Sequence, residues 1–444
     1  MTTFNLLKGH DLNLKGKPSK KVVNINNPEL FAVHPNQYKG MKPKMLVKKG
    51  DTVKIGTPLF YDKSKDKVKI ISPANAVVED IVLGKRRVVE KICLRKIGQE
   101  SQQIKIENSN TENNFKNFLL DSGMWSLIRQ RPFSKVPDPD ISPRAIFLSL
   151  HQTSPFSVDL ELILEDCKHE IELGLKLLKS LTSGNVYLSL KKGSNFIENM
   201  DTSNVKVNYF SGPHPSGNIG VQIHHIEPIA SADDVVYYLS IQDLLSIVRT
   251  YESGEYDMKK VISCAGDGVP NPSYYKIDRG ISMQEILGDI DTEKFRIISG
   301  DVLSGSLSKN DDAMNSFDEI ISVIPEILER EFVGWALPGA SKYSLSNTFL
   351  SSALGLGESN LKTGLNGSIR AIIPFGRWEK VLPMDIYPDF LVKSILANDI
   401  DMMEKLGIYE CDPEDFALCA FSCQSKIEVS KIISNGLEKI EKEG

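Results

Sequence analysis

Hydrophobic and polar residues follow different periodicities in successive parts of the chain. Residues 1–100 carry short alternating runs separated by turns, which is typical of β-strands. Over 115–255, apolar strand-like runs alternate with stretches at helical spacing. Residues 256–375 return mainly to strands, and 376–444 are mostly helical in pattern. The pattern predicts an α+β multidomain protein with these boundaries, and the polar stretch 101–114 is the expected linker.

The strands of residues 1–100 are arranged in two similar halves. The spacing of strands and turns is typical of a barrel-sandwich hybrid, the fold of lipoyl and biotinyl carriers. It is seen in segments 47–62 (VKKGDTVKIGTPLFYD) and 67–94 (KVKIISPANAVVEDIVLGKRRVVEKICL). Lys67 lies five residues before Ser72, which is too close for the usual lipoyl spacing, and no biotin-type Met-Lys-Met occurs. We therefore expect an unmodified domain of this fold.

Helix–strand alternation over 115–255 predicts a Rossmann-like α/β domain. Helices are expected at 115–128, 159–181 and 241–251, and strands at 145–150, 185–190 and 205–209. A nucleotide phosphate would need a glycine-rich turn after such a strand. The chain instead reads HQTSPFSVD after residue 150, and the glycine pairs 266/268 and 355/357 stand outside that context. We expect no nucleotide loop.

Residues 259–305 predict a small β-grasp unit. Strands are expected at 260–265, 274–278 and 295–299, with a helix at 282–287. The unit is similar to the soluble-ligand-binding β-grasp (SLBB) domain in the flavin-carrying subunit of respiratory complex I, where its role is mainly structural. Further helices are expected at 388–398, 401–406, 413–419 and 427–443.

Composition and targeting signals narrow the class of protein. Hydrophobic content of 41% and charged content of 25% are those of a soluble globular protein. No run reaches the ~18–20 apolar residues that cross a bilayer, and the N-terminus lacks a signal core. We expect a cytoplasmic protein that touches a membrane only as a peripheral subunit. The six scattered cysteines fit reduced thiols.

Charge is distributed unevenly along the chain. Residues 1–100 hold 21 Lys and Arg against 9 Asp and Glu, whereas the remaining 344 hold 32 against 49. A basic N-terminal part suits an acidic partner or anionic lipid, and an evenly solvated basic surface is an equal alternative.

Histidines and cysteines form no convincing metal site. His224 and His225 are adjacent, so on a strand they would point to opposite faces, and with His214 they lack further ligands at suitable spacing. We interpret 210–228 as a structural loop. Cys411, Cys419 and Cys423 do not have iron–sulfur spacing and are expected to be core residues.

Residues 121–137 (DSGMWSLIRQRPFSKVP) combine cations and aromatic rings at the predicted end of a helix. Pro132 cannot continue the helical hydrogen bonding. Flat apolar faces beside strong donors suit a planar ligand with carbonyl acceptors, such as a quinone. The alternative is a structural loop with core aromatics and solvated arginines. The candidate residues are Trp125, Arg129, Arg131, Phe133 and Lys135.

Four motifs resemble one family along the chain. They are RQRPFSKVP (129–137), GPHPSGNIGVQIHHIEP (212–228), EDFALCAFSC (414–423) and the C-terminal LEKIEKEG. The resemblance, from Lys8 to the last residue, is to the NqrA subunits of the sodium-translocating NADH:quinone reductases (Na+-NQR), which are relatives of the complex I flavin subunit and of RnfC in the Rnf complex.

This resemblance implies a place in a membrane complex. NqrA is a peripheral part, on the cytoplasmic face of the bacterial inner membrane, of a six-subunit enzyme that passes electrons from NADH to quinone and exports sodium. The resemblance implies quinone binding here, five partner subunits, and flavins and an iron–sulfur centre in those partners, with no cofactor or metal in this chain. The isolated chain is not expected to be active.

At residue level, we expect the quinone headgroup between Tyr38, Gly40 and Met41 on one side and residues 125–135 on the other. Arg129, Arg131 or Lys135 would donate to the carbonyls, and Trp125, Phe133 and Met41 would pack the ring or tail. Residues 31–37 and 151–155 depart from the family pattern, which leaves the pocket wall open.

Two alternatives belong to other classes. The first is a non-catalytic scaffold that docks the membrane subunits through its basic N-terminal part. The second is a self-contained NADH dehydrogenase with its own flavin, which the missing glycine loop opposes.

Overall fold

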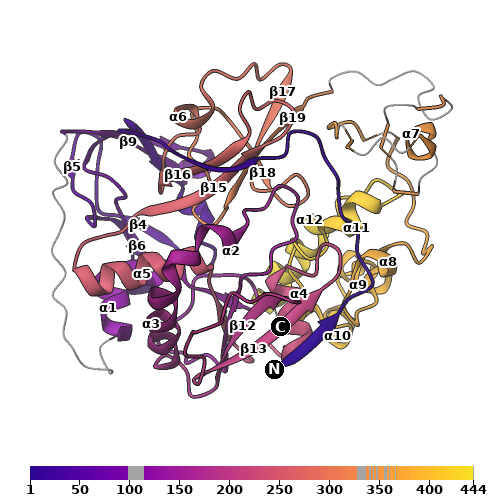
Figure 1. Ribbon diagram of the computed structural model, residues 1–444, viewed down its shortest axis with the longest axis horizontal. Coiled ribbons are helices and arrows are strands. Elements are labelled where there is room, and N and C mark those ends of the chain that lie inside the picture. The colour runs from indigo at the N-terminus through magenta and orange to yellow at the C-terminus, as the bar shows by residue number, and fades with distance from the viewer. Residues whose placement is uncertain are drawn as a thin grey trace.

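The N-terminal domain of the computed structural model is built from two small antiparallel sheets (Figure 1). The structure describes residues 1–98, 115–327 and 337–443, apart from 340, 341, 344, 347, 348, 355–357, 360 and 366. One sheet has the order β3-β9-β8-β5 and the other β4-β6-β7. The strands are β3 (Leu30–Val33), β4 (Pro43–Met45), β5 (Thr52–Val53), β6 (Pro58–Asp62), β7 (Lys65–Ile71), β8 (Ala76–Leu83) and β9 (Val89–Lys96). Alternate residues of β7, β8 and β9, with Leu59 and Phe60 of β6, fill the space between the sheets, as in a sandwich.

The first strands of the chain extend the sheets of other domains. β1 (Thr2–Asn5) pairs in parallel with β13, at the edge of the α/β sheet. β2 (Ser19–Asn24) pairs in parallel with β16 of the β-grasp unit. The N-terminal segment therefore ties the two later domains together, which the sequence pattern did not indicate.

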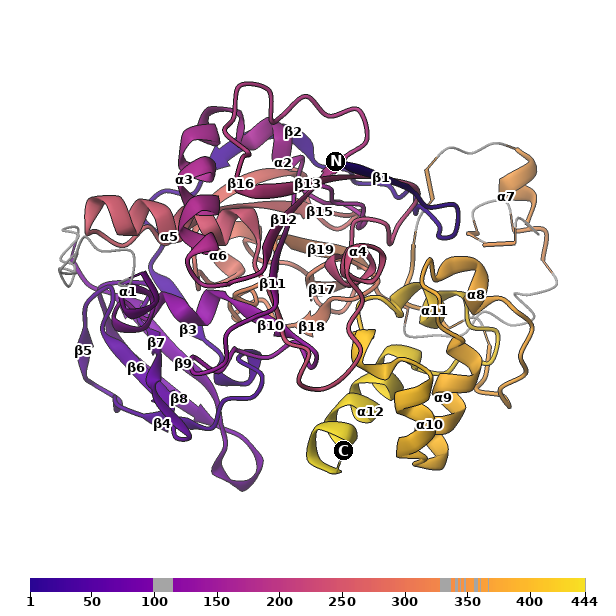
Figure 2. The same cartoon turned by 90° about the horizontal axis from the view of Figure 1, so that it is seen from below.

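The α/β domain has a six-stranded sheet of order β1-β13-β12-β11-β14-β10, parallel except for β10. Alternation along β11 sends Ile146 and Leu148 to one face and Phe147 to the other. Helices α3 and α5 cover the first face, and α4 with the C-terminal helices covers the second (Figure 2). The elements are β10 (Arg129–Arg131), β11 (Ala145–Ser149), α2 (Leu160–Ile163), α3 (Lys168–Lys179), β12 (Asn185–Lys191), β13 (Val205–Ser211), α4 (Ile219–Ile226), β14 (Val236–Tyr238) and α5 (Ile241–Ser253).

Two local predictions in this domain were wrong. The helix expected over 115–128 ends as α1 (Phe115–Asp121), because Gly123 takes a left-handed φ of 75° and a 3-10 turn, Met124–Leu127, follows. The stretch interpreted as loop or strand contains α4, so His224 and His225 lie on a helix. Ile219, Ile223 and Ile226 have the spacing of a helical face, a signal that the glycines and prolines before it obscured.

The β-grasp unit contributes a six-stranded sheet of order β18-β17-β19-β15-β16-β2. Its elements are β15 (Lys259–Ala265), β16 (Ser273–Asp278), α6 (Gln284–Leu287), β17 (Phe295–Ser299), β18 (Ser306–Ser308) and β19 (Ile320–Pro325). The predicted linker 101–114 and most of FVGWALPG (332–339) lie outside the described residues.

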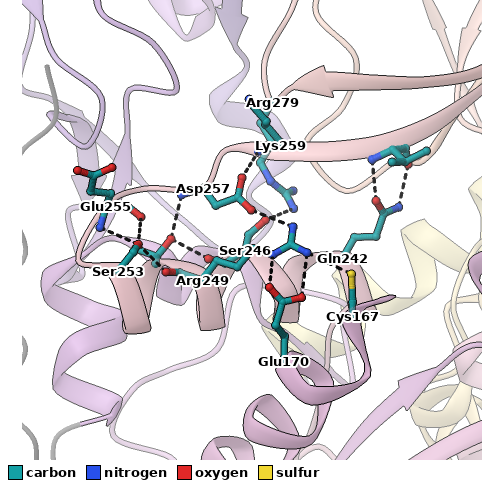
Figure 3. A network of polar contacts seen from close by, with 12 residues as sticks. Cys167, Glu170, Gln242, Ser246, Arg249, Ser253, Glu255, Asp257, Lys259 and Arg279 are labelled. Carbon is teal, nitrogen blue, oxygen red and sulfur yellow. Dashed lines mark hydrogen bonds and ion pairs between the residues drawn. The ribbon is translucent and has the colours of Figure 1, made fainter. Parts of the chain in front are cut away.

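Polar contacts join the α/β domain to the β-grasp sheet (Figure 3). Arg249 of α5 pairs with Glu170 of α3 at 2.9 Å and with Asp257, just before β15, at 3.2 Å. Gln242 donates to the carbonyl of Val261 at 2.8 Å and accepts from its N–H at 2.7 Å. These bonds fix α5 against β15, so the two domains share one continuous core.

The C-terminal helices form a second core against the α/β sheet. Cys411, Cys419 and Cys423 are buried there, as predicted for small core residues. None of the helices in the described ranges is long and apolar enough to cross a membrane. The helices are α7 (Leu350–Ala353), α8 (Trp378–Val381), α9 (Pro388–Ala397), α10 (Ile400–Lys405), α11 (Ala417–Ser422) and α12 (Val429–Glu443).

Candidate functional site

The cation-rich loop begins at the edge strand β10. This strand pairs antiparallel with β14, which places Arg129 opposite Tyr238. The chain then doubles back, and the N–H of Gln130 donates to the carbonyl of Lys135 at 2.9 Å. Phe133 and Ser134 take positive φ values of 76° and 48°, which cost energy in residues other than glycine. Contacts with neighbouring residues must therefore stabilise this conformation of the loop.

The second predicted wall lies directly against this loop. The N–H of Val136 donates to the carbonyl of Lys39 at 3.1 Å. Gly40 has a φ of +82°, and a Cβ placed there would lie 3.0 Å from Cβ of Lys135. A close approach and a left-handed backbone together favour glycine at this position. The structure thus brings together the two segments that the sequence analysis paired.

Two of the predicted residues are buried beneath the loop. The indole N–H of Trp125 donates to the carbonyl of Pro137 at 3.0 Å, and its ring meets Tyr237 edge-on. Tyr38 packs edge-on against Phe317, and its hydroxyl lies 3.2 Å from Oγ of Ser316. Both side chains have satisfied polar atoms and act here as supports for the loop.

Arg131 is buried among three carboxylates of the C-terminal domain. Its Nη2 lies 2.9 Å from Oε1 of Glu414, and its Nη1 lies 3.2 Å from Oδ2 of Asp415 and 3.7 Å from Oδ2 of Asp412. Ser134 donates a short hydrogen bond to Asp412. Because buried charges require partners, these contacts fix the loop to the residues before α11.

The carboxylates of this cluster differ in acidity. Burial raises the pKa of Asp415 to about 7, although Arg131 opposes the rise. Burial and the nearby Asp412 likewise raise the pKa of Glu414. For Asp412, burial is outweighed by Arg131 and other donors, and the pKa falls below its usual value. Asp412 and Asp415 are buried and Glu414 is half-buried. Arg131 and the nearby Arg129 do not compensate all three carboxylates, so the cluster retains a proton at mildly acidic pH.

Arg129 has a different environment from Arg131. Its guanidinium lies over the ring of Tyr238, 4.6 Å from the centroid, and over that of Phe317, at 4.8 Å. Across the described part of the chain, its side chain makes no hydrogen bond or ion pair. The side chain is half-buried. The two rings therefore hold a planar set of donors that has no acceptor among the residues the structure describes.

Phe133 and Lys135 complete the partly exposed side of the loop. The ring of Phe133 meets Tyr409 edge-on, with centroids 6.2 Å apart. Lys135 pairs with Glu441, and its Nζ lies 5.0 Å from the centroid of the Phe133 ring. Gly40 is exposed and Met41 is half-buried beside them. These residues present apolar surface and cations on one side of the loop.

Sequence reasoning missed the residues that hold the loop from a distance. Tyr238, Phe317 and the carboxylates of residues 412–415 come from three later segments. The run CDPED was the available signal, since acidic residues so dense in an otherwise buried stretch need cationic partners.

The histidines of residues 210–228 make structural hydrogen bonds. Nδ1 of His224 lies 2.7 Å from Oε2 of Glu410, and Nε2 of His225 lies 2.7 Å from the carbonyl of Pro383. His214 bonds to Thr153 at 3.2 Å. Among the residues described, no group of His, Cys, Asp and Glu is arranged to hold a metal ion.

The turn after β11 is filled by protein atoms. Nε2 of His151 lies 3.1 Å from Oγ of Ser216, and the N–H of Gly217 donates to Thr153 at 2.9 Å. A Cβ at Gly217 would lie 2.6 Å from the backbone N of Thr153. Two backbone segments therefore meet where a Rossmann fold would hold a phosphate.

Comparisons with known proteins cover the same domains. Three family models match: the NqrA N-terminal barrel-sandwich hybrid domain over residues 4–96, the NqrA second alpha/beta domain over 110–256 and the NQRA C-terminal domain over 261–310. The NqrA subunit of the Na(+)-translocating NADH-quinone reductase of Pasteurella multocida is 37% identical, over 99% of this chain and all of the relative. The corresponding subunits of Hahella chejuensis and Vibrio atlanticus are 37% and 34% identical over the same shares.

The chain belongs to the NqrA family. It is one of the subunits of a Na+-translocating NADH-quinone reductase, and therefore part of a multi-subunit membrane enzyme. The NqrA family models also confirm the predicted fold class, from the barrel-sandwich hybrid through the α/β domain to the SLBB domain. The 129–135 loop and the histidines of residues 210–228 both lie within the NqrA α/β domain.

Proposed function

We propose that this protein binds the quinone headgroup at the partly exposed side of the 129–135 loop. The observation that carries the proposal is Arg129, whose guanidinium is fixed between Tyr238 and Phe317 without an acceptor among the described residues. A quinone carbonyl is a planar acceptor that such donors fit. Because the rings already fix the guanidinium, little conformational entropy is lost when the ligand binds.

The other candidate residues divide into two roles in this proposal. Phe133 and Met41 pack the ring or the tail, Lys135 supplies a second donor, and Gly40 keeps the approach open. Trp125, Tyr38 and Arg131 lie below and hold the loop in its strained conformation. The headgroup would thus contact five of the eight predicted residues directly.

The family context supplies the rest of the proposed reaction. NADH, the flavins and the iron–sulfur centre would reside in the five partner subunits, at the cytoplasmic face of the bacterial inner membrane. Electrons would reach the quinone from those subunits, and this chain would position the acceptor. Such a step needs orientation and proton access rather than a nucleophile.

Binding of a soluble ubiquinone analogue to the purified chain tests this proposal. Quenching of tryptophan fluorescence follows the titration, because Trp125 lies directly beneath the loop. Arg129→Gln should weaken binding about 10–150-fold, since a hydrogen bond to a charged donor contributes about 1.5–3 kcal/mol. Phe133→Leu should weaken it less, by removing the flat face while keeping apolar volume.

The matched control removes an exposed arginine from another domain. Arg95→Gln loses a guanidinium that pairs with Glu79 at 2.8 Å on the surface of the N-terminal domain. It should bind the analogue as the wild type does. Binding that is equally strong in Arg129→Gln would move the site away from this loop. No saturable binding to the wild-type chain would favour a scaffold role.

A further inference from the structure

The hairpin between β8 and β9 carries the most concentrated positive charge of the basic N-terminal domain. Its turn reads Lys85, Arg86 and Arg87 in succession, all exposed. None of these side chains makes a hydrogen bond or ion pair with the described residues. The carboxylate of Glu90 lies against Gly84 at the base of the turn, so three cations face one anion.

Carboxylates farther along the hairpin do not neutralise this charge. Asp80 pairs with Lys49 at 3.0 Å, and Glu79 pairs with Arg95 at 2.8 Å. Lys91, just beyond the turn, pairs with Asp312 at 2.7 Å. Asp80, Glu79 and Asp312 therefore have cationic partners of their own, whereas the three cations of the turn have no ion-pair partner in the described part of the chain.

Apolar side chains flank the cations on both strands. Leu83 is 54% exposed and Val88 is 55% exposed. Two exposed aliphatic residues next to three unpaired cations form an amphipathic tip. The backbone also departs from ordinary geometry, because Arg86 and Arg87 have φ values of 58° and 59°. Two successive left-handed residues are typical of a short hairpin turn, and both side chains are exposed there.

We propose that this hairpin tip, residues 83–88, binds anionic phospholipid headgroups at the membrane surface. Lys85, Arg86 and Arg87 would contact the phosphates, while Leu83 and Val88 enter the layer between the headgroups. A purely acidic protein surface would complement the cations but would give the two aliphatic residues no apolar contact, whereas a lipid layer offers both. The tip would give this component of a membrane enzyme a lipid contact of its own, independent of its quinone site.

Flotation of the full chain with phospholipid vesicles tests the proposal. We expect binding to vesicles of phosphatidylcholine and phosphatidylglycerol, none to phosphatidylcholine alone, and release by salt. Replacing all three cations, in Lys85→Gln/Arg86→Gln/Arg87→Gln, should lower the partition coefficient roughly a hundredfold, because each surface cation contributes about a fivefold factor. Unchanged thermal melting would show that the variant is folded.

A matched control removes the same charge elsewhere on this domain. Lys48, Lys54 and Lys67 are exposed, and their side chains have no hydrogen bond or ion pair with described residues. The triple Gln variant at these positions should keep most of the binding. Equal losses in the two triple variants would overturn the proposal, since they would indicate attraction by net charge alone. So would failure of the wild-type chain to bind anionic vesicles.

A tryptophan probe tests insertion of the tip. Leu83→Trp should show a blue-shifted emission with anionic vesicles and quenching by lipids brominated near the headgroup. Leu46→Trp is the control, because Leu46 is 51% exposed on the same domain but outside the turn. Its emission should not change. An unchanged Leu83→Trp spectrum in the presence of bound vesicles would exclude insertion.

Discussion

Arg129 and Arg131 lie two positions apart on β10 but have different environments. Arg129 and Arg131 both lie over the ring of Tyr238, 4.6 and 5.5 Å from its centroid. Arg131 is 1% exposed and directs its donors to carboxylates, whereas Arg129 has no hydrogen-bond acceptor within the described ranges. The RxR motif alone does not distinguish the two arginines, because the carboxylates that pair with Arg131 are about 280 residues away in sequence. The fold shows that Arg131 has a structural role, and Arg129 is the arginine that we propose to contact a ligand.

The protonation of Asp415 makes stability depend on pH in a defined direction. Its folded pKa of about 7 exceeds the usual carboxyl value of 3.8, so the folded state binds more protons between these values. The stabilisation is complete below pH 3.8 and is lost as the pH rises through 7. Asp415→Asn removes this titration. We expect its free energy of unfolding to fall less than that of the wild type between about pH 5 and 8.

Urea denaturation across this pH range measures the difference. Asp385→Asn serves as the control, because Asp385 is exposed and lies outside the cluster. It should reproduce the wild-type slope. Parallel slopes for Asp415→Asn and wild type would contradict the assignment of a raised pKa to Asp415.

At the scale of elements, sequence periodicity predicted where the strands lie but not which strands pair with one another. β11, β12, β13 and the β-grasp strands lie within a few residues of the predicted ranges, because buried strands carry continuous apolar runs. The short helix α4 was missed, since its glycine-rich approach resembles a loop. The pairing of β1 and β2 with distant sheets was not predictable, because parallel edge strands leave no turn signal.

In helix α4, packing favours glycine over alanine at position 220, against the usual helix propensities. Gly220 lies in its first turn, where alanine would ordinarily stabilise a helix by about 1 kcal/mol. A Cβ at this position would lie 2.1 Å from Oδ2 of Asp415. We therefore expect Gly220→Ala to destabilise the protein, by about 1–3 kcal/mol as in other overpacked sites.

A double-mutant cycle with Asp415→Ala tests this origin. Removing the carboxylate removes the clash, so Gly220→Ala should be much less harmful, or favourable, in that background. Urea denaturation of the four proteins gives the coupling free energy. Additive effects would mean that Gly220 is required for another reason.

At the scale of the molecule, one sheet separates two cores. Phe147, Val236 and Tyr238 of the α/β sheet face the C-terminal helices, and only the short helix α4 of their own domain shares this core in the described residues. Hydrophobic periodicity predicted helices after residue 376, but it could not show which surface they cover. The same helices bring Asp412, Asp415 and Glu441 to the candidate site. The loop is thus complete only when both cores are formed.

Truncation after residue 375 tests this interdependence. It would expose the apolar face of the sheet and remove the three carboxylates that hold Arg131 and the loop. The uncovered apolar and aromatic side chains would destabilise the rest of the chain, because their burial no longer contributes to folding. We expect a truncated chain that binds a hydrophobic dye, melts at lower temperature and has lost quinone-analogue binding. A truncated chain that melts like the full protein would show that the α/β and β-grasp domains are stable alone. If it also bound the quinone analogue normally, the C-terminal carboxylates would not be needed to hold the loop, and Arg129 with its two aromatic rings would suffice.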